Sequence, residues 1–303
     1  MTLRIGSRGS DLALWQANHV ANRLTEPGEI IIIKTAGDKI QHLSLDKVEG
    51  KGFFTTELET ALLENQIDIA VHSHKDLPTE DPPGLKIAAV LPRGPVQDTL
   101  VMHPDWHDPN AAFEIKKNAI VGTSSLRRQA QLRTSLAEIE LKPIRGNVPT
   151  RMQKILSEEV HAVVLAQAGI ERLKLKEQSA YSNLVFHCLA VESACPPPAQ
   201  GALAIQCRSD DTKTLDVLAP LHCQQTAEEI ACERLLLSFF GGGCHLPLGA
   251  YARREGKTLI LLATVDAPDG SEKLVAQIHG AIPEEIAEQA RQELIKQGAE
   301  KYL

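Results

Sequence analysis

The sequence predicts an α/β protein with mainly parallel sheets and a small α+β domain at its C-terminal end. Strand-like and helix-like segments alternate over most of the chain, which is the order of βα units. The run EIIIIKT (29–35) is continuously apolar and β-branched, as expected for a buried parallel strand. From about residue 222 the order changes to a helix, several strands and a last helix, which is typical of a small α+β domain.

The length of 303 residues exceeds what one hydrophobic core usually holds, so several domains are expected. Two stretches, 92–100 and 192–201, have the proline and glycine content of connectors and enclose a second βα series. This arrangement indicates an inserted domain, after which the strand-like segment 203–208 returns to the first domain. The predicted domains are 1–95 with 198–219, 100–192, and 222–303.

The elements of the first domain follow from residue periodicity. Apolar residues at helical spacing between Leu14 and Leu24 predict the first helix. Thr56 and Glu59 form a capping-box signature that opens a second helix. The predicted strands of this domain are 3–8, 29–35, 67–73 and 86–91.

The remaining elements are predicted in the same way. In the second domain, strands at 119–122, 139–144 and 160–166 are each followed by a helix-like segment. In the last domain, Thr226 and Glu229 repeat the capping-box signature, and Pro283 and Gly298 mark the start and end of the final helix.

Composition excludes several classes of protein. The net charge of −7 argues against a nucleic-acid or anionic-membrane binder. The N-terminal residues lack the apolar region of a signal peptide, and no apolar run reaches the length of a membrane span, so a cytoplasmic location is expected. A monomer is expected because no predicted element has a long apolar face beyond what the domain cores would bury. None of the six cysteines forms a C-x-x-C pair, which disfavours a disulfide framework or a zinc knuckle.

One stretch of this acidic chain, 123–154, is strongly basic. Thr123, Ser124 and Ser125 place hydroxyl and backbone N–H groups at a predicted helix start, which favours anions. Arginine side chains nearby can grip carboxylates or phosphates in a bidentate manner. The alternatives to an anion-binding site are a solvent-exposed basic face and a nucleic-acid-binding surface. The arginines of this stretch are Arg127, Arg128, Arg133, Arg145 and Arg151.

The segment VHSHKDLP (71–78) lies where a predicted strand becomes a loop. His72 and His74 alternate on one strand face and could ligate a metal, but no third ligand is evident, and no metal is predicted. Lys75 and Asp76 are either ordinary surface charges or part of a site. An aspartate beside cations stays ionised, so Asp76 could hold N–H donors and stabilise a developing cation.

Two further segments carry candidate site residues. Arg8 and Ser10 lie at the first strand–helix junction, which favours anions. Lys47 and Lys51 flank glycines in a segment that is either a mobile lid or a surface loop. No phosphate loop, dinucleotide fingerprint or nucleophile elbow occurs in the sequence.

The segment FFGGGCHLPLG (239–249) places three glycines before Cys244. With disulfide and metal roles disfavoured, this cysteine remains a structural residue, a nucleophile or an anchor.

Eight segments occur in an order that resembles the porphobilinogen deaminase family: RIGSRGSDLALWQA, KVEGKGFF, VHSHKDLPT, VGTSSLRRQAQL, RGNVPTR, LAQAGIERL, AQGALAIQCR and GGGCHLPLG. The resemblance implies two domains like the halves of periplasmic binding proteins and a small third domain that carries the cysteine. It implies head-to-tail condensation of four porphobilinogen molecules, with release of ammonia, to give 1-hydroxymethylbilane. It also implies one dipyrromethane cofactor per chain, joined to Cys244 by a thioether.

Motif by motif, the resemblance assigns roles to residues of this chain. Asp76 matches the catalytic aspartate. The cofactor-binding residues that it implies, besides Cys244, are Lys75, Thr123, Ser124, Ser125, Arg127, Arg128, Arg151 and Gln200. The substrate-binding residues that it implies are Arg8, Ser10, Lys47, Lys51, Arg145 and Arg172.

Some positions depart from the family pattern. Ala199 stands in place of a glycine before Gln200, and Gly241 in place of an acidic residue, while His74 and His245 are also unusual. Two other functions remain open on the residues alone. One is a solute-binding protein for a polycarboxylate, and the other is a transferase with a cysteine nucleophile.

Overall fold

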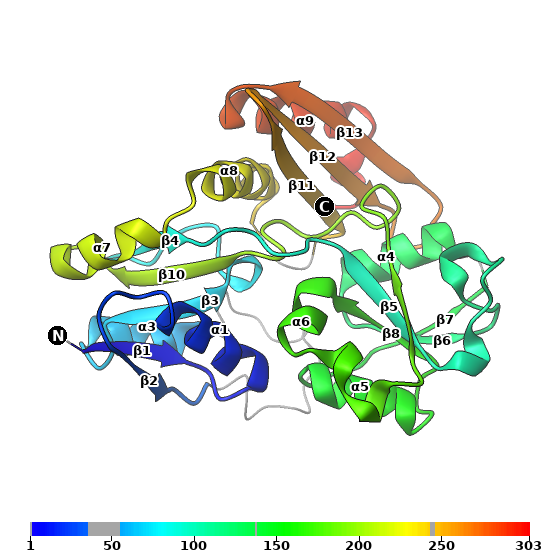
Figure 1. The fold of residues 1–303 in the computed structure, drawn as a ribbon. Helices are drawn as coiled ribbons and strands as arrows, with labels where there is room; N and C mark the ends of the chain where they lie inside the picture. Colours follow the sequence, from blue (N-terminus) through cyan, green and yellow to red (C-terminus); the bar gives the residue numbers. More distant parts are fainter. Residues whose placement is uncertain (1, 36–54, 137, 243–245) are drawn as a thin grey trace. The chain divides into compact units, whose positions relative to one another are not determined.

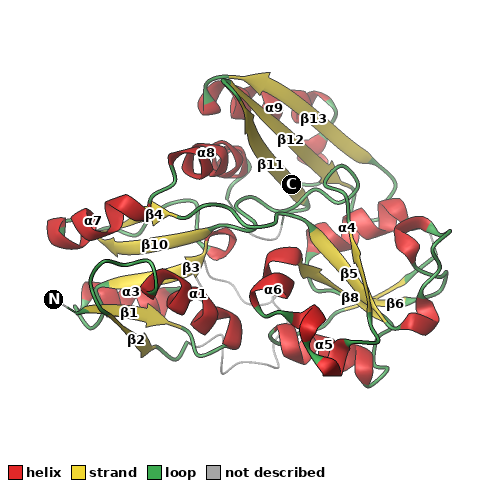
Figure 2. Cartoon of the chain, in the orientation of Figure 1, coloured by secondary structure: helices red, strands yellow, loops and turns green. Residues whose placement is uncertain are grey.

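The computed structural model describes residues 2–35, 55–136, 138–242 and 246–303 (Figure 1). The chain forms two compact units. Unit 1 comprises residues 1–94 and 201–230, and unit 2 comprises residues 95–200 and 231–303. Helices cover the sheets of both units, which confirms the predicted α/β class (Figure 2). The predicted division into three domains stays a prediction, because the contacts group the second and third sheets together.

Unit 1 is built on one five-stranded sheet in the order β2-β1-β3-β10-β4. Four strands run in the same direction, and β10 is inserted antiparallel between β3 and β4. The predicted return of the chain to this sheet at 203–208 is therefore confirmed. The strands are β1 (Leu3–Ser7), β2 (Gly28–Ile32), β3 (Ile69–Ser73), β4 (Leu85–Val90) and β10 (Leu203–Arg208).

The two faces of this sheet are covered differently. One face packs against α1 (Asp11–Ala21) and α7 (Thr212–Leu218) through a large apolar cluster. The other face packs against α3 (Thr56–Leu63) through a smaller one. The strand β2 is parallel, as predicted, but it lies at the sheet edge and is largely exposed, so its predicted burial is wrong.

The two predicted capping boxes are also wrong. Thr56 is the first helical residue of α3 and not its N-cap, which is Thr55. Helix α8 (Gln224–Phe239) already begins two residues before Thr226. Because a capping box requires its hydroxyl residue at the N-cap, neither pair can form one. Glu59 is consequently available to interact with the sheet below α3.

Unit 2 contains a second sheet with the order β7-β6-β8-β5-β9, in which β5 runs antiparallel to both neighbours. Helix α4 (Leu126–Ser135) packs on one face, and α5 (Val148–Leu156) packs on the other. The remaining elements are β5 (Asp98–Met102), β6 (Ile120–Gly122), β7 (Glu140–Lys142), β8 (Ala162–Ala166), α6 (Gln167–Arg172) and β9 (Val185–Cys188).

The third sheet, also in unit 2, is antiparallel with the order β11-β12-β13. Its core includes Leu236 of α8 and Ile286 of α9 (Pro283–Lys296). Contacts between α4 and β12 join this sheet to the second one, and Arg133 Nη1 donates to the Pro268 carbonyl at 2.7 Å. The strands are β11 (Leu248–Glu255), β12 (Thr258–Asp266) and β13 (Lys273–Gly280).

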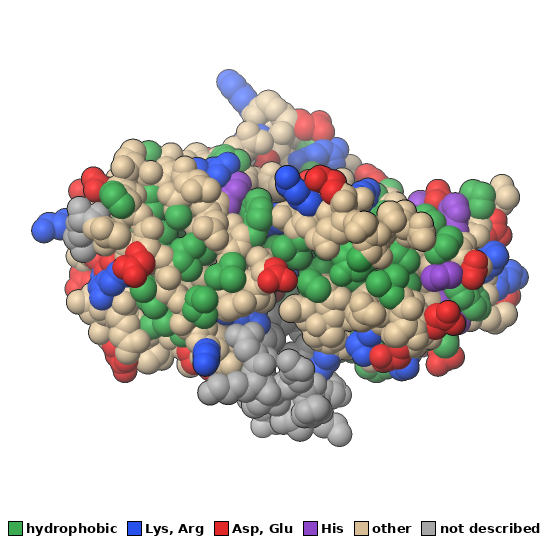
Figure 3. All heavy atoms as spheres, turned by 60° about the horizontal axis from the view of Figure 1, so that its bottom comes forward, with side chains coloured by type: hydrophobic (Ala, Val, Ile, Leu, Met, Phe, Trp, Pro, Cys, Tyr) green, Lys and Arg blue, Asp and Glu red, His purple; other side chains and the backbone are tan. Residues whose placement is uncertain are grey.

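Short 3-10 helices complete the described chain. They are His74–Asp76, Pro104–Trp106, Ala112–Glu114, Leu175–Glu177, Ser179–Tyr181, Ala219–Leu221 and Ala299–Lys301. No helix within the described ranges combines the length and the apolar character that crossing a membrane requires. Lys and Arg side chains are interspersed with Asp and Glu side chains on the face drawn in Figure 3.

The connector before Gln200 is held by a buried carboxylate. Glu233 of α8 accepts hydrogen bonds from the backbone N–H groups of Ala199, at 2.6 Å, and Ala252, at 2.7 Å. Ala199 itself has a φ of 63°, in the left-handed region that favours glycine, and its side chain is fully buried. The departure of this position from the family's glycine therefore strains the backbone, because the Cβ approaches the following carbonyl oxygen.

Ala199→Gly is expected to raise the free energy of unfolding by about 0.5–1 kcal/mol, because relief of the strain exceeds the entropy that glycine adds to the unfolded chain. Chemical denaturation measures this difference. Ala202→Gly is the matched control, since Ala202 is also buried but has no positive φ, and this variant should be less stable. Equal destabilisation by both substitutions would contradict the assignment of strain to Ala199.

Candidate active site

The carboxyl ends of β1 and β3 form a topological switch point in unit 1. The chain leaves β1 toward β2 on one side of the sheet, while β3 pairs with the other side of β1. Open α/β sheets bind ligands outside the strand ends at such a point. Arg8 directly follows β1, and Asp76 follows β3 in the 3-10 helix η2 (His74–Asp76). The fold therefore brings these two predicted site residues to one place.

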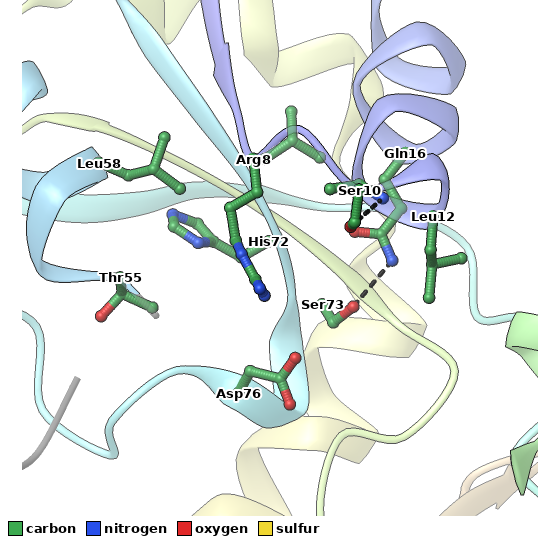
Figure 4. A pocket seen from close by; sticks show the side chains of 11 residues that line it. Arg8, Ser10, Leu12, Gln16, Thr55, Leu58, His72, Ser73 and Asp76 are labelled. Carbon is green, nitrogen blue, oxygen red and sulfur yellow. Dashed lines mark hydrogen bonds between the residues drawn. The ribbon is translucent and has the colours of Figure 1, made fainter. Parts of the chain in front are cut away.

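A pocket opens at this point (Figure 4). Within it, the Arg8 side chain extends toward Asp76, and the His72 ring lies beside Arg8. Gln16 Nε2 donates to Ser73 Oγ at 2.8 Å. A guanidinium, a carboxylate and neutral polar groups thus share one wall. The lining residues are Arg8, Ser10, Leu12, Ala13, Gln16, Thr55, Leu58, Val71, His72, Ser73 and Asp76.

Ser10 has a structural task in addition to lining the pocket. It is the N-cap of α1, and its Oγ accepts a hydrogen bond from the Ala13 N–H at 3.3 Å. Its position is fixed because the cap satisfies a backbone donor that the helix leaves open. Lys75 lies in η2 but is not among the pocket-lining residues of the described chain. Lys47, Lys51 and Cys244 lie outside the described residues.

Sequence reasoning missed three polar residues of this pocket: Gln16, Thr55 and Ser73. Gln16 did leave a signal, because it occupies a buried position of α1 beside Ala17 and is only 3% exposed. A polar residue at a core position of an amphipathic helix indicates a specific partner. The sequence identifies His72 only as a possible metal ligand. The described residues include no cluster of three or more His, Cys, Asp or Glu side chains suited to a metal ion.

The corresponding strand end in unit 2 is the start of α4. Ser125 is the N-cap, and its Oγ accepts from the Arg128 N–H at 3.4 Å. Thr123 Oγ1 accepts from the Ser125 N–H at 3.2 Å, and Ser124 Oγ donates to the Ile144 carbonyl at 2.7 Å. These contacts order the segment between β6 and α4. The three predicted hydroxyl residues therefore lie together at the N-terminus of α4, where hydrogen bonds fix their positions.

Arg127 and Arg128 converge on Asp98, which sequence reasoning missed. Arg127 Nη2 lies 2.7 Å from Asp98 Oδ2, and Arg128 Nη2 lies 2.6 Å from Asp98 Oδ1. Gln200 Nε2 donates to the same carboxylate at 3.0 Å. Their partners in the structure are thus protein groups, and their predicted contacts with a bound group stay predictions.

Charge pairing outweighs burial at Asp98. Burial by itself would raise the pKa of Asp98, but attraction and hydrogen bonds from Arg128 and Arg127 hold that pKa well below its usual range. Burial lowers the pKa of Arg127, with Asp98 opposing the change. The three residues are at most 9% exposed, so each charge depends on the others for compensation.

Three other predicted arginines lie in unit 2. Arg145 follows β7, and its Nη2 is buried without a hydrogen-bond partner among the described residues. Arg151 Nε donates to the Gly146 carbonyl at 2.9 Å. Burial lowers the pKa of Arg172, the last residue of α6, to about 10, although Glu171 opposes this change. The buried Arg145 Nη2, which has no hydrogen-bond partner among the described residues, is suited to bind an anionic ligand.

The glycines before Cys244 have a conformational reason. Gly241 and Gly242 follow the end of α8 with φ values of 89° and 71°. The Gly242 N–H donates to the Leu237 carbonyl at 3.0 Å, closing the helix end in the manner of a Schellman motif. A Cβ added to Gly241 would meet no atom within 4 Å. Backbone conformation therefore explains these two glycines, and at Gly241 no described group approaches closely.

Asp98→Asn is expected to lower the free energy of unfolding by about 3–5 kcal/mol, because two buried guanidinium groups lose their counter-charge. Urea denaturation measures the loss. Asp105→Asn provides a control in the same unit, since the Asp105 side chain is 82% exposed, and its effect should stay within about 0.5 kcal/mol. Similar small effects of both substitutions would show that Asp98 does not anchor the arginine pair.

Comparison with known proteins identifies the family. A family model described as the dipyromethane cofactor binding domain of porphobilinogen deaminase matches residues 3–216. The porphobilinogen deaminase C-terminal domain model matches residues 227–297. The BvgS periplasmic VFT2 domain of Bordetella pertussis, a solved structure, is 12% identical with a TM-score of 0.43 and covers 77% of this chain and 92% of that chain.

Curated relatives match over nearly the whole chain. Porphobilinogen deaminase from Lysinibacillus sphaericus (strain C3-41) is 42% identical over 97% of this chain and 94% of its own length. Porphobilinogen deaminase from Alkaliphilus metalliredigens (strain QYMF) is 39% identical over 100% of this chain and 95% of its own length. The matches confirm the resemblance drawn from the eight sequence segments. The chain belongs to the porphobilinogen deaminase family.

Proposed function

We propose that this chain is an enzyme that condenses four porphobilinogen molecules head to tail, releasing ammonia, to give 1-hydroxymethylbilane. The observation that carries the proposal is the convergence of Arg8 and Asp76 on one pocket at the ends of β1 and β3. Porphobilinogen presents a pyrrole N–H, two carboxylates and an aminomethyl group. The pocket offers a carboxylate for the N–H and a guanidinium for a carboxylate.

Asp76 is the proposed catalytic residue. When the aminomethyl C–N bond breaks, both electrons leave with nitrogen as ammonia, and a positive charge spreads over the pyrrole ring. A carboxylate fixed beside the ring stabilises this charge without forming a covalent bond. Arg8 and Ser10 are proposed to hold a carboxylate of the same substrate molecule, which fixes the ring against Asp76. Asp76 is exposed in the described structure, so a substrate can reach it.

The residues of unit 2 fit a dipyrromethane group, which the matched family domain binds. Its acetate and propionate carboxylates require cationic partners, and Arg145 offers a buried donor without a partner among the described residues. We assign cofactor or chain carboxylates to Arg145, Arg151 and Arg172, together with the hydroxyl cluster at the start of α4. Once attached to Cys244, the group supplies the free pyrrole position on which the product is built.

The other predicted contacts receive more specific roles. Arg127, Arg128 and Gln200 are proposed to fix the start of α4 through Asp98, so that Thr123, Ser124 and Ser125 face the cofactor from a rigid helix start. Lys75, Lys47 and Lys51 are proposed to contact carboxylates from the loops that carry them. We also propose that the chain acts as a cytoplasmic monomer on this small substrate, without nucleic acid or membrane, in keeping with its charge of −7.

Asp76→Ala is expected to fold normally and to lose at least about a thousandfold in kcat, as expected when a group that stabilises transition-state charge is removed. Release of ammonia and formation of the bilane are measured with porphobilinogen. Glu80→Gln is the control, because it removes an exposed carboxylate from the same loop and should leave the rate within twofold. A near-normal rate in Asp76→Ala would remove Asp76 from the mechanism.

Cys244→Ser is expected to lack a covalent adduct. Intact-protein mass spectrometry should show the wild-type chain carrying two porphobilinogen-derived units and the variant carrying none. Cys223→Ser, which changes a half-buried cysteine elsewhere in the chain, should keep the adduct. A bare wild-type mass in an active preparation would contradict the cofactor assignment. Binding of porphobilinogen without ammonia release would instead favour a solute-binding protein.

A further inference from the structure

A group of buried polar side chains lies beneath α3, beside the pocket of unit 1. In the antiparallel pairing of β3 with β10, His72 is opposite Ala204, and Gln206 is opposite Ala70. Because side chains alternate between the faces of a sheet, His72 and Gln206 share a face with Ala70. This is the face that α3 covers. His72 is 6% exposed, and Gln206 is fully buried.

Gln206 lies near both this histidine and a carboxyl group on α3. Burial lowers the pKa of His72 to about 4, and the influence of Gln206 only partly opposes this change. Burial raises the pKa of Glu59, while contacts with Thr55 and Gln206 oppose it, and the negative charge of Asp81 adds to it. The Gln206 carboxamide therefore lies near enough to influence the pKa of both the imidazole and the carboxyl group.

The group is costly to the fold. Among the described residues, His72 Nε2, both polar atoms of the Gln206 side chain and Glu59 Oε1 are buried without a hydrogen bond of good geometry. Each buried polar atom left in this way costs about 1–3 kcal/mol. The rest of the α3 face is apolar, with Leu58, Ala61 and Leu62 packed on the sheet. Because apolar residues would avoid this cost, the group calls for a functional explanation.

The position of His72 in the pocket wall suggests a function for this group. Its ring forms part of the pocket wall together with Arg8 and Asp76 (Figure 4). Among the described residues, the charged groups that face this region are Arg8 and Asp76 in the pocket, Glu59 on α3, and Asp81 acting on Glu59. A protonated imidazole here would compete with Arg8 for Asp76. It would also repel the positive charge that develops as ammonia leaves. An uncharged ring avoids both effects.

We propose that His72 is a positioning residue of this pocket: burial beneath α3 keeps its imidazole uncharged beside Arg8 and Asp76, and Gln206 orients the ring. The proposal rests on the proposed function. A neutral imidazole keeps one donor and one acceptor nitrogen, so the partner of one nitrogen decides what the other presents. Gln206 is suited to this task because its amide can donate or accept and carries no charge. A carboxylate at position 206 would instead stabilise the imidazolium.

Gln206→Glu tests the proposal, since it adds a charge with little change in shape. The pH at which His72 titrates, followed by NMR, should rise by at least about one unit, and kcat/KM at pH 6 should fall at least about tenfold relative to its value at pH 8. KM should change less than kcat, because the charge acts on the chemical step. In His72→Asn/Gln206→Glu the additional loss at pH 6 should disappear, because no imidazole remains to titrate.

Gln206→Met is the matched neutral variant. It should leave the acid limb of the pH profile in place and lower kcat, because the imidazole loses its orienting partner without gaining a charge. If Gln206→Glu raises the titration point of His72 but leaves the pH profile unchanged, the charge of His72 does not matter and the proposal is wrong. Wild-type His72 titrating at its ordinary pKa of about 6.5 would also overturn it.

A stability measurement separates this proposal from the proposed function. Because the folded pKa of His72 lies below the ordinary value of 6.5, the unfolded chain binds more protons between pH 6.5 and about 4. Stability from neutral His72 is present above pH 6.5 and is lost as the pH falls toward 4. The wild type should therefore lose more stability over this range than His72→Asn. Equal losses would contradict the neutral state of His72, whereas failure to turn over porphobilinogen would contradict only the function.

Discussion

The buried pairing of Asp98 with Arg127 and Arg128 is the constraint on which unit 2 depends. Asp98 begins β5, the strand that runs antiparallel between β8 and β9, and the two arginines occupy the first turn of α4. The carboxylate also holds Gln200 at the end of the connector. One side chain thus ties together a strand, a helix and a connector. Removing its charge would leave two buried cations uncompensated, which makes the arrangement specific.

The same pairing shapes the chemistry of the unit. By fixing the first turn of α4, it places the hydroxyl groups and backbone N–H groups of Thr123–Ser125 at a rigid helix start. Arginines that engage a protein carboxylate are ordered before any ligand arrives, so little further entropy is lost on binding. Arg145, in contrast, keeps a buried donor open among the described residues. The basic stretch therefore contains two kinds of arginine: those paired with a buried protein carboxylate, and one with a buried donor that has no partner among the described residues.

In unit 1, one strand likewise has two roles. The inserted strand β10 completes the sheet and also brings Gln206 beside His72, behind the pocket that Arg8 and Asp76 line. Its neighbour in the chain, the connector with Ala199, adopts a left-handed φ without a glycine. That strain is held by the hydrogen bond to Glu233. The returning strand thus both completes the sheet and contributes a polar side chain behind the pocket.

The sequence by itself determined the α/β class, the returning strand, the candidate residues Arg8 and Asp76 and the family, because these depend on local periodicity and on short motifs. It did not determine which partners the arginines have, which residue caps α3, or that Gln16 and Ser73 meet in the pocket. Apart from the α3 cap, which is local, those features are long-range contacts: Asp98, Arg127 and Gln200 come from three separate segments. Only the tertiary structure brought them together, because burial and the need to compensate each buried charge decide such contacts after the sheets have formed.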